Sequence, residues 1–99
     1  MTVNYSGVNL VVAVRNGRAW LKVWVDGQVV SPPGAAGRIY NDGQVVSFTG
    51  QQSVEVRTGS SGVTYFTLNG KSLGTLGRPG SSETWLFTPN AAPKQTNRT

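Results

Sequence analysis

The stretch VNLVVAVRNGRAWLKVWVDG, residues 8–27, decides the fold class. It holds two runs rich in valine, leucine and tryptophan, separated by Asn16-Gly17. An Asn-Gly pair between two such runs is a strong signal for a β-hairpin with a two-residue turn. No apolar spacing of three and four residues, typical of an amphipathic helix, occurs here. The stretch therefore predicts two antiparallel strands, Val8–Arg15 and Arg18–Val25.

The predicted hairpin also assigns the faces of the two strands. Cross-strand partners in an antiparallel pair lie on the same face of the sheet. A two-residue turn at Asn16-Gly17 gives four partner pairs that are all apolar: Val14–Ala19, Val12–Leu21, Leu10–Val23 and Val8–Val25. This face is expected to be the core. Asp26-Gly27 predicts a second tight turn, into a short strand at 28–31 that brings Val30 to the same side.

The rest of the chain continues in the same way, with turn signals at short intervals among thirteen glycines and five prolines. Further strands are expected at 38–40, 44–49, 53–58, 63–68, 71–73 and 83–88, with a hairpin around Gly50–Gln52. Their inward set is Val46, Phe48, Val54, Val56, Phe66, Leu68, Leu73, Trp85 and Phe87. The pattern predicts an all-β fold: a small antiparallel two-sheet sandwich, or a distorted barrel, of about 7–8 short strands.

The 99 residues fit a single domain. Residues 1–88 are expected to form one β-domain, and residues 89–99, which are small, polar and weakly basic, a flexible C-terminal tail. The N-terminal segment Met1–Gly7 lacks the basic and apolar regions of a signal peptide. No apolar run in the chain has the length of a transmembrane helix.

Composition excludes several kinds of chemistry. The chain has no cysteine and no histidine, which excludes disulfides, thiolate or imidazole metal sites and Ser-His-Asp triads. Its carboxylates are Asp26, Asp42, Glu55 and Glu83. Asp26 and Asp42 precede glycine in turns, where an Asp side chain bonds to the backbone, and Glu55 with Arg57 is expected to be an ordinary surface pair. We predict that the chain is not an enzyme and holds no metal or cofactor.

The other face of the predicted hairpin carries the candidate binding residues. In that register Arg15, Arg18, Trp20, Lys22 and Trp24 form one strip of aromatic rings and interleaved cations. Such a strip suits docking onto a protein partner or stacking on bases or sugars. With the strip exposed, Trp24→Ala is expected to weaken partner binding by about 2 kcal/mol at little cost to the fold. The three cations would steer an acidic partner.

Two alternatives to an exposed strip remain open. A bulge could turn Trp20 inward, or the loop at 32–37, Pro-Pro-Gly-Ala-Ala-Gly, could cover the strip. The charge leaves the partner class open as well, because nine Lys and Arg against four acidic residues give a net charge of +5. A small basic β-barrel that binds nucleic acid or another polyanion is one alternative function. A carbohydrate-binding module is another.

A resemblance to a known protein family favours one of these functional classes. The segment VTYFTLNGKSLGTLGRPG, residues 63–80, resembles the pattern "vevtlNGkplGplGkpG" of the C-terminal domain of RodZ-type bacterial cell-shape proteins. Residues 20–23, 25–28, 41–44 and 54–59 are similar to the same family. The Pro-rich loop at 31–37 and Ser60 depart from its pattern.

The resemblance implies a parent protein with a cytoplasmic helix-turn-helix domain, one membrane span, a linker and this domain outside the membrane. It implies that the parent engages the actin-like MreB filament only through its cytoplasmic part. The outer part would contact a protein of the cell-wall elongation machinery, and nucleic-acid binding is not expected. The family offers no catalytic residues. We therefore expect a non-enzymatic, extracytoplasmic interaction domain, in the periplasm or on the outer face of the membrane.

Overall fold

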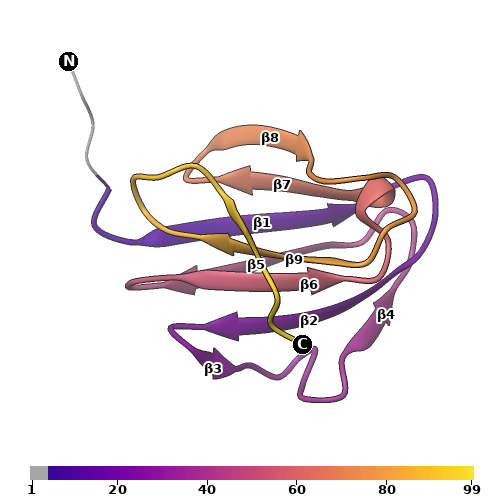
Figure 1. The fold of residues 1–99 in the computed structure, drawn as a ribbon, viewed down its shortest axis with the longest axis horizontal. Coiled ribbons are helices and arrows are strands. Elements are labelled where there is room, and N and C mark those ends of the chain that lie inside the picture. Colours follow the sequence, from indigo (N-terminus) through magenta and orange to yellow (C-terminus); the bar gives the residue numbers. More distant parts are fainter. Residues whose placement is uncertain (1–4) are drawn as a thin grey trace.

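A computed structural model describes residues 5–99, so the first four residues of the predicted domain and of the N-terminal segment lie outside the described part. Two antiparallel sheets pack face to face (Figure 1). In spatial order, the four-stranded sheet contains β5 (Val45–Gly50), β1 (Val8–Val14), β7 (Thr64–Leu68) and β8 (Lys71–Thr75). The six-stranded sheet contains β10 (Lys94–Thr96), β9 (Glu83–Phe87), β6 (Val54–Thr58), β2 (Ala19–Val25) and β3 (Gln28–Val29), and β4 (Arg38–Tyr40) also pairs with β2.

The predicted all-β, two-sheet sandwich is confirmed, with ten strands where about 7–8 were expected. The strand positions agree closely with the predicted ranges. A short 3₁₀ helix, η1 (Ser61–Val63), connects β6 to β7. Among residues 5–99, no helix has the length and apolar character needed to cross a membrane.

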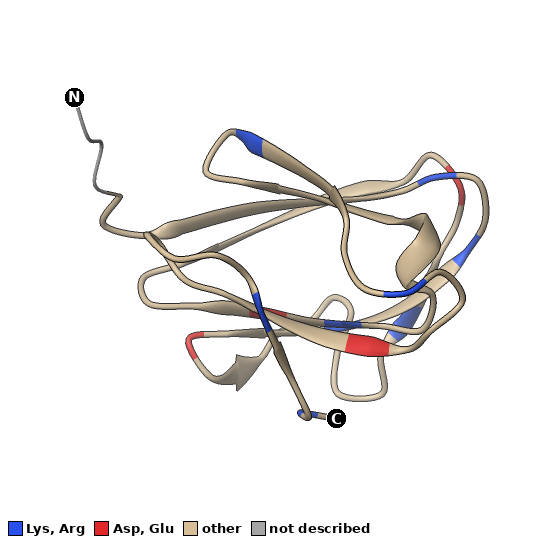
Figure 2. Ribbon diagram, turned by 45° about the horizontal axis from the view of Figure 1, so that its top comes forward, with Lys and Arg blue, Asp and Glu red and all other residues tan. Residues whose placement is uncertain are grey.

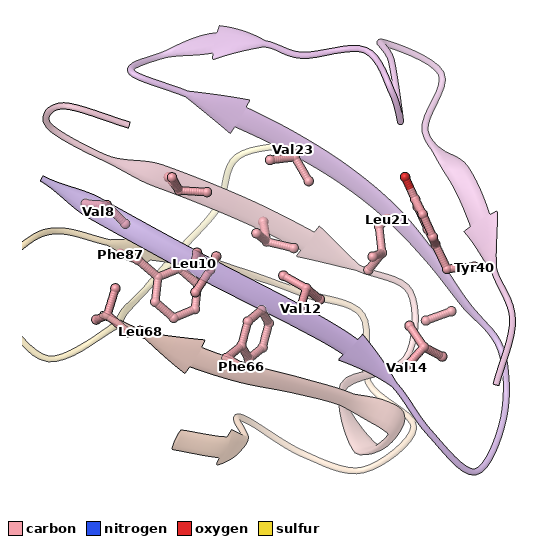
Figure 3. Close-up of a cluster of buried hydrophobic side chains, with 13 residues drawn as sticks. Val8, Leu10, Val12, Val14, Leu21, Val23, Tyr40, Phe66, Leu68 and Phe87 are labelled. Atoms are coloured by element: carbon pink, nitrogen blue, oxygen red, sulfur yellow. The ribbon is translucent and has the colours of Figure 1, made fainter. Parts of the chain in front are cut away.

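The core lies between the sheets and is made of the inward side chains of both (Figure 3). Val8, Leu10, Val12 and Val14 alternate along β1 and are buried, as the sequence pattern predicts. The rings of Phe66 and Phe87, one from each sheet, lie 4.9 Å apart between their centroids. The other members are Ala19, Leu21, Val23, Tyr40, Val54, Val56 and Leu68, with Val46, Phe48, Leu73 and Trp85 half-buried against them.

The hairpin predicted at Asn16-Gly17 is wrong. β1 pairs with β5 and β7, whereas β2 belongs to the opposite sheet and pairs with β3, β4 and β6. The turn geometry gives the reason. Asn16 has φ 67°, but Gly17 has φ 158°, far from the value of about 90° that the second residue of a type I′ turn needs. The Arg15 N–H donates to the Val63 carbonyl, so the chain leaves β1 toward β7 and crosses to the other sheet.

The hairpin expected around Gly50–Gln52 is also a crossing, because β5 and β6 lie in different sheets. Two other turns do form hairpins. Asp26-Gly27 joins β2 to β3, and Asn69-Gly70 joins β7 to β8. Both residues of each turn have positive φ, between 50° and 82°, as a type I′ turn requires.

Asp26 ties this β2–β3 turn to the crossing between the sheets. Its carboxylate accepts backbone N–H bonds from Gln51 at 3.0 Å, Gln52 at 2.7 Å and Ser53 at 3.0 Å. These bonds, with that from Gln51 the largest contributor, hold the pKa of Asp26 below its ordinary value of 3.8. The carboxylate therefore stabilises the fold more strongly when it is ionised than when it is protonated.

We expect the Asp26→Asn variant to be less stable than the wild type at neutral pH and to approach it in acid. Because folding lowers the pKa of Asp26, its contribution is complete above the unfolded-state pKa and is lost as the pH falls through the folded-state value. Urea denaturation at several pH values between about 7 and 2 measures the gap between the two proteins. A gap that stays constant down to the lowest pH would show that the three bonds do not depend on ionisation.

The segment expected to be a flexible tail adds a strand instead. β10 pairs antiparallel with β9, with Lys94 opposite Leu86 and Thr96 opposite Thr84. The chain then crosses the outer face of the six-stranded sheet toward β2 (Figure 1). The Arg98 carbonyl accepts a bond from the Thr84 hydroxyl at 2.6 Å. Residues 94–99 are therefore part of the sandwich, and we call residues 96–99 the C-terminal strap.

Candidate interaction surface

The predicted strip of five residues is divided between the two sheets. Trp20, Lys22 and Trp24 lie on the outer face of the six-stranded sheet, along β2. Arg15 follows β1 of the other sheet, and its guanidinium carbon lies 5.7 Å from the centroid of the Tyr65 ring. Arg18 is exposed in the crossing between the sheets. The single aromatic and cationic strip is therefore wrong, because it depended on the β1–β2 hairpin.

Trp24 is buried, with 5% of its surface exposed. The C-terminal strap covers it. The Arg98 guanidinium carbon lies 5.0 Å from the centroid of the indole ring, and the Lys22 ammonium lies 5.1 Å from it. The Lys22 ammonium also donates to the Thr99 carbonyl at 3.1 Å. The indole is held beneath two cations, which is a favourable arrangement for its electron-rich face.

Trp20 is half-buried against the loop that connects β3 to β4, which is one of the two alternatives left open by the sequence. Its indole N–H donates to the Ala36 carbonyl at 3.1 Å. Gly37, with φ 73°, lies so close to the indole ring that a Cβ at this position would overlap with it. The loop at 32–37 therefore fixes Trp20 in place through one hydrogen bond and one close backbone approach.

The Gly37→Ala substitution is expected to destabilise the fold by about 2–3 kcal/mol, because it adds overlap with Trp20 to the cost of a positive φ. Gly43→Ala is a matched control: Gly43 has φ 91°, but a Cβ there meets no atom within 4 Å. We expect the control to cost about 1 kcal/mol. Chemical denaturation followed by tryptophan fluorescence measures both. Equal losses for the two variants would contradict the packing of Gly37 on Trp20.

With both indoles covered, the exposed apolar groups beside β2 are smaller. Ile39 lies opposite Trp20 in β4, and Val29 lies opposite Trp24 in β3. Their side chains are 51% and 40% exposed. Of the five residues of the predicted site, Arg15 and Arg18 are exposed, and Trp20 and Lys22 are half-buried.

The amino-acid composition does not predict the C-terminal strap or the ion pair between Arg98 and Glu55. Glu55, on β6 opposite Trp24, is buried and accepts hydrogen bonds from the Thr96 hydroxyl and, at 3.0 Å, from Arg98. Arg57 bonds to the Thr84 hydroxyl at 3.1 Å rather than to Glu55. The expected Glu55–Arg57 surface pair is therefore wrong. A basic residue near the end of a polar segment carries no local signal of a distant carboxylate partner.

All four carboxylates take part in holding the chain together. Asp26 binds three backbone N–H groups, and Asp42 accepts the Asn16 N–H at 3.0 Å. Glu83 is buried and accepts the Ser61 hydroxyl at 2.9 Å, while Glu55 pairs with Arg98. No two carboxylates share a site, and residues 5–99 contain no group of three or more potential metal ligands. Each of the four carboxylates therefore has a hydrogen-bond partner that ties separate parts of the chain together.

The cations are spread over the molecule rather than gathered in one groove. Figure 2 shows Lys and Arg on several loops, on strands and on the C-terminal strap, with acidic residues among them. A nucleic-acid site usually has a continuous basic stripe that follows the phosphate backbone. This distribution does not favour the polyanion-binding alternative.

Comparison with known protein families shows a match for most of the sandwich. The model of a family described as the RodZ C-terminal domain matches residues 12–84. The matched region begins inside β1 and ends inside β9, so it contains strands of both sheets but not β10. No curated protein and no solved structure matches the chain significantly.

Proposed function

The chain belongs to the RodZ C-terminal domain family, and from this premise we propose that it is the extracytoplasmic interaction domain of a membrane-anchored cell-shape protein. In this proposal the domain has no catalytic activity and contacts proteins of the cell-wall synthesis machinery. The family match over residues 12–84 is the observation that carries it. The structural use of all four carboxylates also supports a binding role.

Deletion of the domain from its parent protein tests the role in cell shape. Cells that carry the truncated parent are expected to lose rod shape or the normal placement of wall growth. The matched control is a parent carrying Ile39→Ala, since this exposed side chain contributes little to the fold. Unchanged shape and growth zones in the truncated strain, with the parent present at normal levels, would overturn the proposal.

The location can be tested with introduced thiols, because the chain has no cysteine of its own. Ser72→Cys places a thiol on the exposed part of β8, and Val23→Cys places one in the core. A membrane-impermeant maleimide is expected to label the Ser72→Cys parent in intact cells and the Val23→Cys parent only after denaturation. Labelling of Ser72→Cys only after lysis would place the domain in the cytoplasm.

A further inference from the structure

A pocket opens between the two sheets at one side of the sandwich. Its volume is about 430 Å³. β5 of the four-stranded sheet forms one wall, and β2, β4 and the start of the β3–β4 loop form the other. Most of the lining side chains are apolar: Val25, Val30, Pro32, Tyr40, Val46 and Phe48. A pocket of this size and character suits apolar side chains of a partner.

Tyr40 lines this pocket and also carries a buried polar atom without a partner in the described part of the chain. The residue is 3% exposed, and its hydroxyl has no hydrogen-bond partner among residues 5–99. Figure 3 shows the ring reaching from β4 with the hydroxyl at the end away from Val14. A buried hydroxyl without a partner costs the fold free energy, and Tyr40 contributes its ring, not an accessible hydroxyl, to the pocket.

β5 is an edge strand with free main-chain groups beside the pocket. Its register opposite β1 pairs Val46 with Val12 and Phe48 with Leu10. The Gly43 N–H donates to the Val14 carbonyl, so the main-chain groups of Val14 point toward β5. In an antiparallel pair every second residue does the same, and the main-chain groups of Val46 and Phe48 therefore bond to β1.

The N–H and C=O groups of the intervening β5 residues, Val45, Ser47 and Thr49, point away from β1. No described residue bonds to them. An edge of this kind is a template for an added strand.

The charges at the two ends of the groove differ. Arg38 is exposed, and its guanidinium carbon lies 5.7 Å from the centroid of the Tyr40 ring. At the far end, Gly50 lies next to Val25 and the Asp26 carboxylate. An acidic partner group is therefore favoured near Tyr40 and disfavoured near Gly50.

We propose that this groove binds an extended peptide segment of a partner protein, which adds to β5 as an antiparallel strand. Its alternate side chains are apolar and enter the pocket, and an acidic residue at its C-terminal end faces Arg38. The antiparallel direction places the C-terminal end of the segment beside Val45, on the Tyr40 side. Main-chain bonds give the affinity and the pocket gives the specificity, as in other cases of strand addition. The inference rests on the proposed function only in assigning protein binding to the domain.

A defined probe tests the groove: the peptide acetyl-Thr-Val-Thr-Val-Thr-Glu-amide. In the proposed register its threonines lie opposite Val45, Ser47 and Thr49, and its valines face the pocket. Titration into ¹⁵N-labelled domain is expected to shift the amide signals of β5 and the signals of Tyr40. β8 is a matched control, because it is the other edge strand of the same sheet and does not line the pocket. Equal shifts on both edges, or none on β5, would overturn the proposal.

N-methylated probes test the main-chain bonds without altering the protein. Methylation of the three threonine amides removes the donors that face β5 and is expected to weaken binding by about tenfold or more. Methylation of the two valine amides is the control and is expected to leave these bonds in place. If neither set of methyl groups weakens binding, the peptide does not add to β5 as a strand. If only methylation of the valine amides weakens binding, the peptide lies parallel to β5 and the stated orientation is wrong.

Three variants test the protein side. Ser47→Pro removes an N–H that faces away from β1, so the sandwich keeps its own bonds while binding falls by about tenfold. Tyr40→Phe removes only the buried, unpartnered hydroxyl and is expected to leave binding of the probe unchanged, because the ring that lines the pocket remains. Arg38→Ala is expected to weaken binding of the probe by about threefold. When glutamine replaces the glutamate of the probe, Arg38→Ala and the wild type are expected to bind it equally well. Arg78→Ala makes the same change in net charge on the loop between β8 and β9 and is expected to have no effect on binding.

Two further outcomes separate this inference from its alternatives. Concentration-dependent shifts of the β5 amides without any peptide would show that a second copy of the chain occupies the edge, which would overturn the proposal. The cell experiment then distinguishes the two proposals. Normal rod shape in cells whose parent carries Ser47→Pro, together with lost rod shape on domain deletion, would reject the groove and leave the proposed function standing.

Discussion

The Phe66→Ala variant is expected to lose about 3–5 kcal/mol of unfolding free energy, the usual cost of truncating a buried aromatic ring. Phe66 is 1% exposed, and its ring packs on Phe87 from the opposite sheet. The substitution removes the principal aromatic contact between the sheets and leaves a cavity that neighbouring valines cannot fill. For a domain of this size the loss is a large fraction of the total stability.

Urea denaturation of the domain measures this effect. The exposed Ile39→Ala is the control, and we expect it to change the stability by no more than about 0.5 kcal/mol. A loss below about 1 kcal/mol for Phe66→Ala would mean that the sheets do not pack through this aromatic pair.

The second large effect is expected for Trp24→Ala, with a loss of about 3 kcal/mol. From the sequence, Trp24 was interpreted as an exposed docking residue whose removal costs the fold little. The structure places it under Arg98 and Lys22, with 5% of its surface exposed. Truncation would remove the ring on which both cations rest and open a void under the C-terminal strap.

Trp24→Ala can be compared with Val29→Ala, a change at an exposed position directly opposite in β3. The denaturation midpoints of the two variants give the difference in their stability. A stable Trp24→Ala protein that fails to bind its partner would contradict the burial of this indole and restore its role in docking.

The alternation of apolar residues predicted the faces correctly even where the predicted pairing was wrong. Leu10 and Val12 point inward because every second residue of a strand lies on one side of the sheet, whichever strand is its neighbour. The same holds for Leu21 and Val23 in β2. Most of the core could therefore be predicted from local pattern, although Tyr40 was not among the predicted inward residues.

The pairing of the strands could not be predicted in the same way, because similar turn sequences lead to different outcomes. Asp26-Gly27 and Asn69-Gly70 form hairpins, but Asn16-Gly17 does not. Around the last pair, the bonds from the Asn16 N–H to Asp42 and from the Arg15 N–H to Val63 direct the chain across the sandwich. These partners are distant in sequence, so tertiary contacts override the preference of the dipeptide.

The prediction of a single exposed strip depended on that pairing, and the structure divides its residues between the two sheets. The C-terminal strap was not predicted because residues 89–99 have the composition of a disordered segment. Its position depends on the Arg98–Glu55 ion pair and on the pairing of β10 with β9. The groove beside β5 was missed for a similar reason, since it exists only once β5 occupies the edge of its sheet.

The crossing at Asn16-Gly17 also sets the order in which the chain can fold during its synthesis. β1 is an inner strand of its sheet, and its Leu10 pairs with Phe48 on one side and with Leu68 on the other. The chain must therefore be available as far as β7, with Leu68, before β1 has both neighbours. Until then the run VNLVVAV lacks its native partners, and such apolar β-forming runs promote aggregation. This topology therefore predicts that the domain folds slowly and late. Until it folds, the unfolded chain needs protection from aggregation.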